Sequence, residues 1–105
     1  MKVNERRTMK ILEPYRVRID ELDDAIVDLL IARTDIVRAV GVLKSKEGIP
    51  AVLPDRVEEV ISRATTRAET HGLDAGLVRN LYTMLVDYSC YLEEQIMADE
   101  KKGHG

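Results

Sequence analysis

Two basic residues interrupt an apolar helical pattern in the first half of the chain. Arg33 falls where apolar residues recur at steps of three and four, and a guanidinium buried there must meet an anion. Lys44 comes eleven residues later, only about 20° further round a helix, so both cations share one face. No acidic residue occupies that face between them, because Asp35 points about 200° away. The pattern indicates either an ion pair with an acidic residue of another helix or a site for an anionic ligand.

Two further arginines are candidates for the same site. Arg16 lies about 100° round the helix from Arg33, so it does not serve that site within one straight helix. Across an antiparallel dimer it can serve the partner's site; otherwise it is a solvated arginine near a helix start. Arg56 falls in the first turn of a second predicted helix, where a cation opposes the helix dipole unless an anion is nearby.

A third predicted helix carries two apolar stripes of different quality. Ser89 and Glu93 lie one turn apart on the more polar stripe, so Glu93 either faces water or joins the site. The more apolar stripe is predicted to face the core and consists of Leu77, Leu81, Leu85, Tyr88, Leu92 and Ile96.

The elements that must position these side chains are all predicted to be helices. The first runs from Pro14 to about Lys46, with an apolar seam formed by Ile19, Leu22, Ile26, Leu29, Ile36, Val40 and Leu43. A loop follows, and the second helix begins at Pro54 and ends near Thr70, before Gly72. Asp74 is the expected N-cap of the third helix. We therefore predict an all-α, three-helix domain over residues 10–98, with flexible ends at 1–9 and 99–105.

The length of the first helix predicts assembly. At ~1.5 Å per residue it spans roughly 48 Å, whereas a compact domain of this size has a radius of gyration of ~13 Å. Two shorter helices cannot cover such a seam along its whole length. We expect an intertwined helical homodimer.

Composition excludes several classes of function. The 105 residues carry 16 Lys and Arg against 19 Asp and Glu, a net charge of −3, which argues against a general nucleic-acid binder. A single cysteine, Cys90, excludes a disulfide framework, and with two histidines it offers no metal-ligand spacing. No apolar run approaches the ~20 residues of a membrane span, and no secretory signal is apparent. We expect a cytoplasmic protein without a metal.

The spacing of the cations resembles that of the all-helical chorismate mutase family, which includes 4-amino-4-deoxychorismate mutases and isochorismate-pyruvate lyases. Supporting features are Leu22-Asp23 after Arg16, Leu29-Leu30 before Arg33, Leu73-Asp74-Ala75 at a helix start, and the positions of Lys44, Arg56, Ser89 and Glu93. The resemblance covers about residues 12–97 and implies a dimer with two identical dicarboxylate sites and no cofactor.

The resemblance also implies a role for each candidate residue. Arg33 and the partner's Arg16 would bind the two substrate carboxylates with help from Ser89, and Lys44 would hold a carboxylate and the ether oxygen. Arg56 would line the pocket. The reaction is a pericyclic shift that breaks a C–O bond, so catalysis needs positioning and donors at the developing charge, not a nucleophile.

Two departures from the family bear on the substrate. Glu93 stands where these mutases usually have a Gln that donates to the ether oxygen, and it can donate only when protonated. Burial favours that form, whereas Lys44 and Arg33 oppose it. Leu53 and Val57 replace acidic residues that bind the ring hydroxyl in typical mutases, which favours a substrate recognised differently at that carbon, such as the amino analogue.

Three functions therefore compete. The leading prediction is an isomerase that converts chorismate or its 4-amino-4-deoxy analogue to prephenate or 4-amino-4-deoxyprephenate. The second is an isochorismate-pyruvate lyase that gives salicylate with the same cations. The third is a non-catalytic helical dimer in which Arg33 is merely salt-bridged, although a pure dimerisation helix gains nothing from placing Arg33 and Lys44 on one face.

Overall fold

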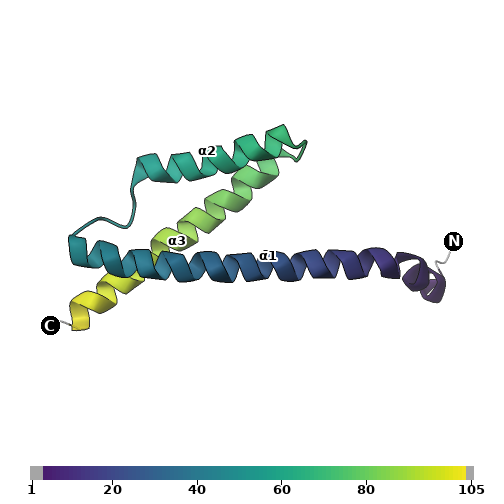
Figure 1. Ribbon diagram of the computed structural model, residues 1–105, viewed down its shortest axis with the longest axis horizontal. Helices are drawn as coiled ribbons and strands as arrows, with labels where there is room; N and C mark the ends of the chain where they lie inside the picture. The colour runs from purple at the N-terminus through teal and green to yellow at the C-terminus, as the bar shows by residue number, and fades with distance from the viewer. Residues whose placement is uncertain (1–3, 104–105) are drawn as a thin grey trace. The chain divides into compact units, whose positions relative to one another are not determined.

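The computed structural model describes residues 4–103, and every regular element in that range is a helix (Figure 1). The helices are α1 (Glu5–Glu47), α2 (Pro54–Thr70) and α3 (Ala75–Gly103). The prediction of an all-α chain with a long first helix is confirmed. The chain divides into two units, Met1–Arg33 and Thr34–Gly105, which are described separately.

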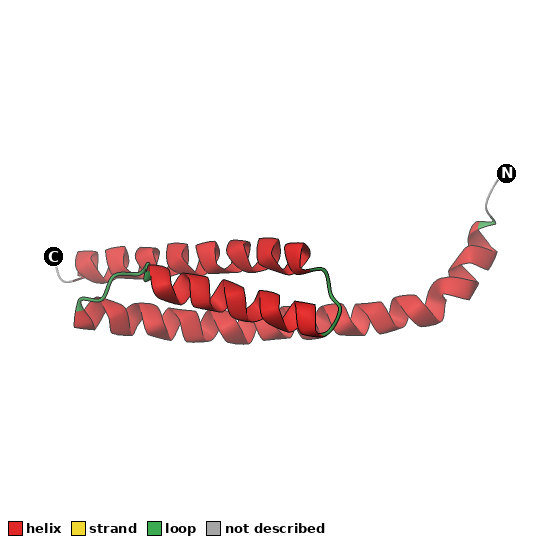
Figure 2. Ribbon diagram, turned by 90° about the horizontal axis from the view of Figure 1, so that it is seen from above, coloured by secondary structure: helices red, strands yellow, loops and turns green. Residues whose placement is uncertain are grey.

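The unit Met1–Arg33 contains the first part of α1, and this helix begins nine residues before Pro14, where we expected it to start. Asn4 provides the N-cap, because its side-chain Oδ1 accepts a hydrogen bond of 3.1 Å from the backbone N–H of Arg7. Pro14 therefore lies inside the helix, where it has no N–H to donate to the preceding turn. Figure 2 shows α1 bending near its N-terminal end, which is the usual consequence of such a proline.

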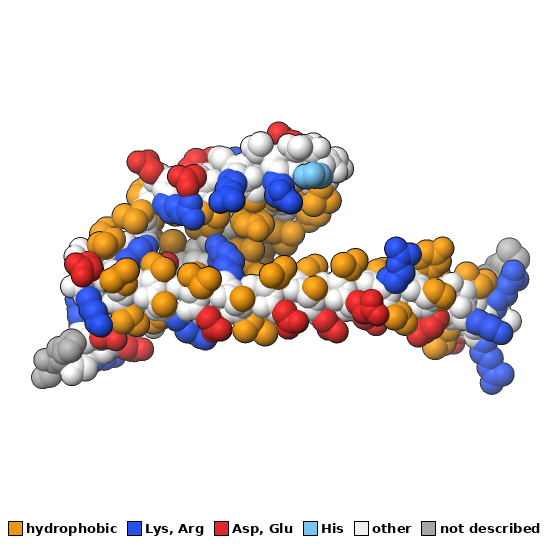
Figure 3. All heavy atoms as spheres, in the orientation of Figure 1, with side chains coloured by type: hydrophobic (Ala, Val, Ile, Leu, Met, Phe, Trp, Pro, Cys, Tyr) orange, Lys and Arg blue, Asp and Glu red, His pale blue; other side chains and the backbone are white. Residues whose placement is uncertain are grey.

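No described residue of Met1–Arg33 is buried. Large aliphatic side chains of the predicted seam stay in solvent, including Leu22 at 65% and Leu29 at 70% exposure. Figure 3 shows such hydrophobic side chains along much of α1. The seam of this unit therefore has no partner within its own unit.

The unit Thr34–Gly105 has a small core where α2 packs against α3. Both helices end or begin as the sequence predicts. Pro54 is in the first turn of α2, and Gly72 with φ +73° closes its C-terminus in a Schellman motif, with Leu73 N–H donating to Ala68 C=O at 2.9 Å. Asp74 caps α3 through a 3.1 Å hydrogen bond from the backbone N–H of Leu77. The α3 helix then continues to Gly103, past residue 98.

The buried face of α3 is not the face that we expected. Its buried residues are Val78, Val86, Ser89 and Glu93, which follow the more polar stripe. Leu77, Leu81 and Tyr88 of the more apolar stripe are each about half exposed. Leu85, Leu92 and Ile96 of the same stripe are half-buried, so the single chain covers that stripe only in part.

Within the described residues, no helix is both long enough and apolar enough to cross a membrane. The same residues, 4–103, contain no group of His, Cys, Asp and Glu side chains arranged to hold a metal ion.

Candidate functional site

The most distinctive polar contact in the structure joins the end of α1 to the middle of α3. Lys44 Nζ lies 2.7 Å from Oε1 of Glu93, and the two side chains are only 14% and 8% exposed. The acidic partner that the apolar seam lacked is thus supplied by another helix. Glu93 is buried, so the alternative that it faces water is wrong.

Both the backbone and the side chain of Lys44 form hydrogen bonds. Its backbone C=O accepts a 2.9 Å hydrogen bond from Ile49 N–H, which closes the C-terminus of α1 around Gly48 at φ +67°. Its Nζ donates a 2.9 Å hydrogen bond to the backbone carbonyl of Ala51, a buried residue in the loop before α2. The loop therefore wraps back over the lysine that precedes it.

The Glu93 carboxylate keeps unused hydrogen-bonding capacity. Its Oε1 is buried, forms the ion pair with Lys44 Nζ at 2.7 Å, and has no other polar partner within hydrogen-bonding distance among the described residues. Lys44 likewise has three N–H donors, of which the Ala51 carbonyl takes one.

Ser89 lies one turn before Glu93 on the same buried face. Its Oγ donates a 2.8 Å hydrogen bond to the backbone carbonyl of Leu85, as serines inside helices often do.

The other candidates are distributed differently. Arg56 is in the first turn of α2, and its guanidinium pairs with Glu59 of the same helix while remaining well exposed. Leu53 is the residue before α2 and Val57 is half-buried in its first turn. Arg16 is exposed and Arg33 is half-buried, and both belong to the unit Met1–Arg33. The structure thus brings Lys44 and Glu93 into contact and places Ser89 beside them.

Two contributors were missed by the sequence reasoning. The Ala51 carbonyl is a backbone group, and no side-chain pattern reveals it. Gly41 is the only buried residue described in α1, and it lies against Glu93. A glycine inside an otherwise regular helical pattern does signal a close approach of two backbones, so Gly41 could have been found.

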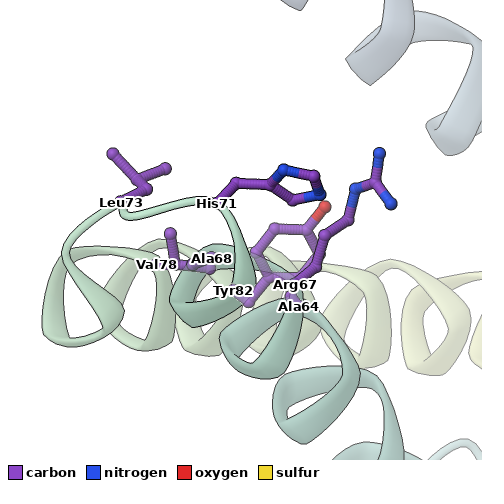
Figure 4. A pocket seen from close by; sticks show the side chains of 7 residues that line it. All are labelled: Ala64, Arg67, Ala68, His71, Leu73, Val78 and Tyr82. Carbon is purple, nitrogen blue, oxygen red and sulfur yellow. The ribbon is translucent and has the colours of Figure 1, made fainter.

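A separate hollow of about 390 Å³ lies between α2 and α3 near their connection and is shown in Figure 4. Its floor is apolar, and the ring of His71 and the hydroxyl of Tyr82 point toward one another at its edge (Figure 4). None of the predicted site residues lines it.

The single cysteine lies next to the Lys44–Glu93 pair along α3. Burial raises the pKa of the Cys90 thiol above its ordinary value, and the negative charge of Glu93 raises it further, while Lys44 acts in the opposite direction. The pKa of this thiol therefore depends on the charges of Glu93 and Lys44.

The family model of chorismate mutase type II matches residues 15–94, and the chain belongs to this family. The chain is thus an isomerase of the chorismate mutase type.

Three relatives narrow the comparison. A 4-amino-4-deoxychorismate mutase of Streptomyces venezuelae is 34% identical over 85% of this chain and 86% of its own length. A second 4-amino-4-deoxychorismate mutase, of Streptomyces pristinaespiralis, is 32% identical over 83% of this chain and 67% of its own. An isochorismate pyruvate lyase of Pseudomonas aeruginosa is 37% identical over 81% of each chain.

Proposed function

We propose that this isomerase acts on 4-amino-4-deoxychorismate in preference to chorismate. The observation that carries the proposal is the pair Leu53 and Val57, two aliphatic side chains at the entry to α2. A ring hydroxyl bound by acidic residues would find no partner there, and an unpaired polar group in a desolvated site is costly. Two relatives named for the amino substrate support this choice.

The proposed chemistry is a rearrangement held in place by cations. Arg33 and the partner's Arg16 would bind the two carboxylates, with Ser89 assisting and Arg56 lining the pocket after leaving Glu59. Lys44 would donate its remaining N–H groups to a carboxylate and to the ether oxygen, where negative charge develops as the C–O bond breaks. No cofactor takes part in these steps.

Glu93 would complete the donor set from the other side of the ether oxygen. It must be protonated to donate, and its carboxyl group is buried beside Lys44.

The proposed active form is a homodimer in which each chain contributes Arg16 to the other's site. Support comes from the exposed seam of α1, because solvent-exposed large aliphatics over several turns are typical of an interface. The cytoplasmic location expected from the sequence is part of the same proposal.

One experiment separates the candidate functions. The purified protein is incubated in turn with 4-amino-4-deoxychorismate, chorismate and isochorismate, and products are followed by chromatography. We expect the highest kcat/KM for the amino substrate. Higher kcat/KM for chorismate would overturn the assigned preference, and release of pyruvate and salicylate from isochorismate would identify a lyase.

The lyase is the second candidate because of the relative from Pseudomonas aeruginosa. Turnover of none of the three substrates would leave the non-catalytic dimer.

A further inference from the structure

Gly41 lies in close contact with α3. A Cβ added to this residue would lie 3.1 Å from Cδ1 of Ile96, 3.3 Å from Cα of Glu93 and 3.4 Å from Cγ of Glu93. The first of these atoms ends a flexible side chain, which can rotate away. The second is backbone, so relief of that contact requires α3 itself to shift at Glu93.

The same glycine lies one turn before the lysine that Glu93 contacts. Positions three apart face the same side of a helix, so Glu93 spans from Gly41, where its Cα and Cγ rest, to Lys44, where its carboxylate ends 2.7 Å from Nζ. Because Lys44 is also tied to the Ala51 carbonyl, the lysine cannot follow a displaced Glu93 without giving up that bond.

We propose that Gly41 is a positioning residue for the Lys44–Glu93 pair: the missing side chain sets the spacing of α1 and α3 that lets the two groups meet. Its consequence for catalysis rests on the proposed function, whereas its consequence for the geometry of the pair does not. Gly41 touches no reacting atom and acts only through Glu93.

The test compares Gly41→Ala with a matched glycine substitution. Gly103→Ala adds the same methyl group to a helix where nothing lies within 4 Å, so it controls for the change in backbone freedom. We expect Gly41→Ala to lower kcat/KM by up to roughly tenfold, since a misplacement of catalytic groups by about 1 Å costs about a hundredfold and the shift here is smaller. Gly103→Ala should match the wild type.

A second substitution separates positioning from simple packing. Ile96→Val deletes Cδ1, the atom nearest to the added methyl group, and leaves the contact with Glu93 Cα in place. The double variant Gly41→Ala/Ile96→Val should therefore recover thermal stability but not kcat/KM, and Ile96→Val alone should keep near wild-type kcat/KM. If the double variant recovers both, Gly41 serves only to pack against Ile96 and the proposal is wrong.

A crystal structure of the double variant gives a readout that needs no substrate. We expect the distance between Lys44 Nζ and Glu93 Oε1 to exceed the 2.7 Å of the wild type by a few tenths of an ångström, the shift that the added methyl group demands of α3 at Glu93. An unchanged distance overturns the positioning role, whatever the activity. If the wild type turns over none of the three substrates, the proposed function fails and this distance still decides the role of Gly41.

Discussion

The two units of this chain treat their apolar and charged residues in opposite ways. Within Thr34–Gly105, the helices bury a lysine and a glutamate against each other, with a backbone carbonyl and a glycine holding them in place. Within Met1–Arg33, a regular apolar seam stays in solvent and no described residue is buried. The unit Thr34–Gly105 buries a polar pair, whereas the unit Met1–Arg33 leaves its large apolar side chains exposed.

This difference in burial is consistent with different roles for the two units. The polar pair is a poor device for stability alone, because two apolar residues of similar volume often pack at least as well as a buried ion pair. The exposed seam is a poor surface for an isolated chain, because apolar patches of this kind favour association. The contrast fits a site in one unit and an interface in the other, and the following experiments test each side.

The largest effect is expected for Lys44→Ala. This change leaves Glu93 buried without its cation, so the free energy of unfolding should fall by about 3–5 kcal/mol, and turnover should be nearly abolished. Lys46→Ala, at an exposed position of the same helix end, is the control. Chemical denaturation and kcat/KM measure the two effects. Wild-type kcat/KM in a folded Lys44→Ala protein would remove this residue from the site.

Arg33→Ala tests the proposed role of Arg33 in binding a substrate carboxylate. We expect a loss of about 3–5 kcal/mol in transition-state binding, since a substrate carboxylate would lose its charged partner. Steady-state kinetics measure this loss, and thermal unfolding monitors the fold. If the variant is destabilised but keeps full kcat/KM, Arg33 serves the structure and not the site.

A charge placed in the exposed seam tests the interface. Leu29→Glu puts a carboxylate at a 70% exposed position, which costs an isolated chain little but cannot be buried between two copies. Sedimentation should show dimers of the wild type and a species near the chain mass of 11.9 kDa for the variant. Thr66→Glu, at an exposed position of α2, is the control. A wild type that sediments as a folded monomer contradicts the dimer.

A smaller effect, visible mainly in its pH dependence, is expected at Glu93. If the protonated form donates to the ether oxygen, the competent fraction grows as pH falls, so wild-type kcat/KM should rise toward acid. Glu93→Gln supplies a donor at every pH and should flatten this profile while keeping or raising kcat/KM near pH 8. A wild-type profile that is flat between about pH 5 and 8, with an inactive Glu93→Gln, would show that the carboxylate acts as an anion.

The smallest effect concerns the thiol beside the pair. Because the charge of Glu93 raises the pKa of Cys90, Glu93→Gln should lower that pKa and speed alkylation by iodoacetamide at pH 8. The increase should be less than about tenfold, since one pKa unit changes the thiolate fraction tenfold. Glu94→Gln should act more weakly, because Glu94 contributes less to the same shift than Glu93 does. Slower alkylation of Glu93→Gln would contradict the assigned charge.

The local structure of this protein could be predicted from its sequence to a large extent. Pro54, Gly72 and Asp74 mark helix ends because each satisfies or frees backbone groups within its own turn, which needs no distant partner. The predicted start of α1 was wrong, and the cause is also local. Asn4 caps the helix through its own side chain, and the helix continues through Pro14 because it tolerates the one backbone hydrogen bond that proline cannot donate.

The sequence also determined which residue types could meet an anion, since a cation in an apolar stripe needs a partner wherever it lies. Only the tertiary structure shows which residue pairs with Lys44, namely Glu93. Periodicity finds two stripes on α3 but cannot say which one is covered, because burial depends on the size and position of the neighbouring helix. The contact of Glu93 with Lys44 and the close approach of Glu93 to Gly41 join segments far apart in the chain, and a one-dimensional pattern carries no information about such distances. The hydrogen bond from Lys44 to the Ala51 carbonyl is closer in sequence, but it depends on the path of the loop before α2, which side-chain periodicity does not describe.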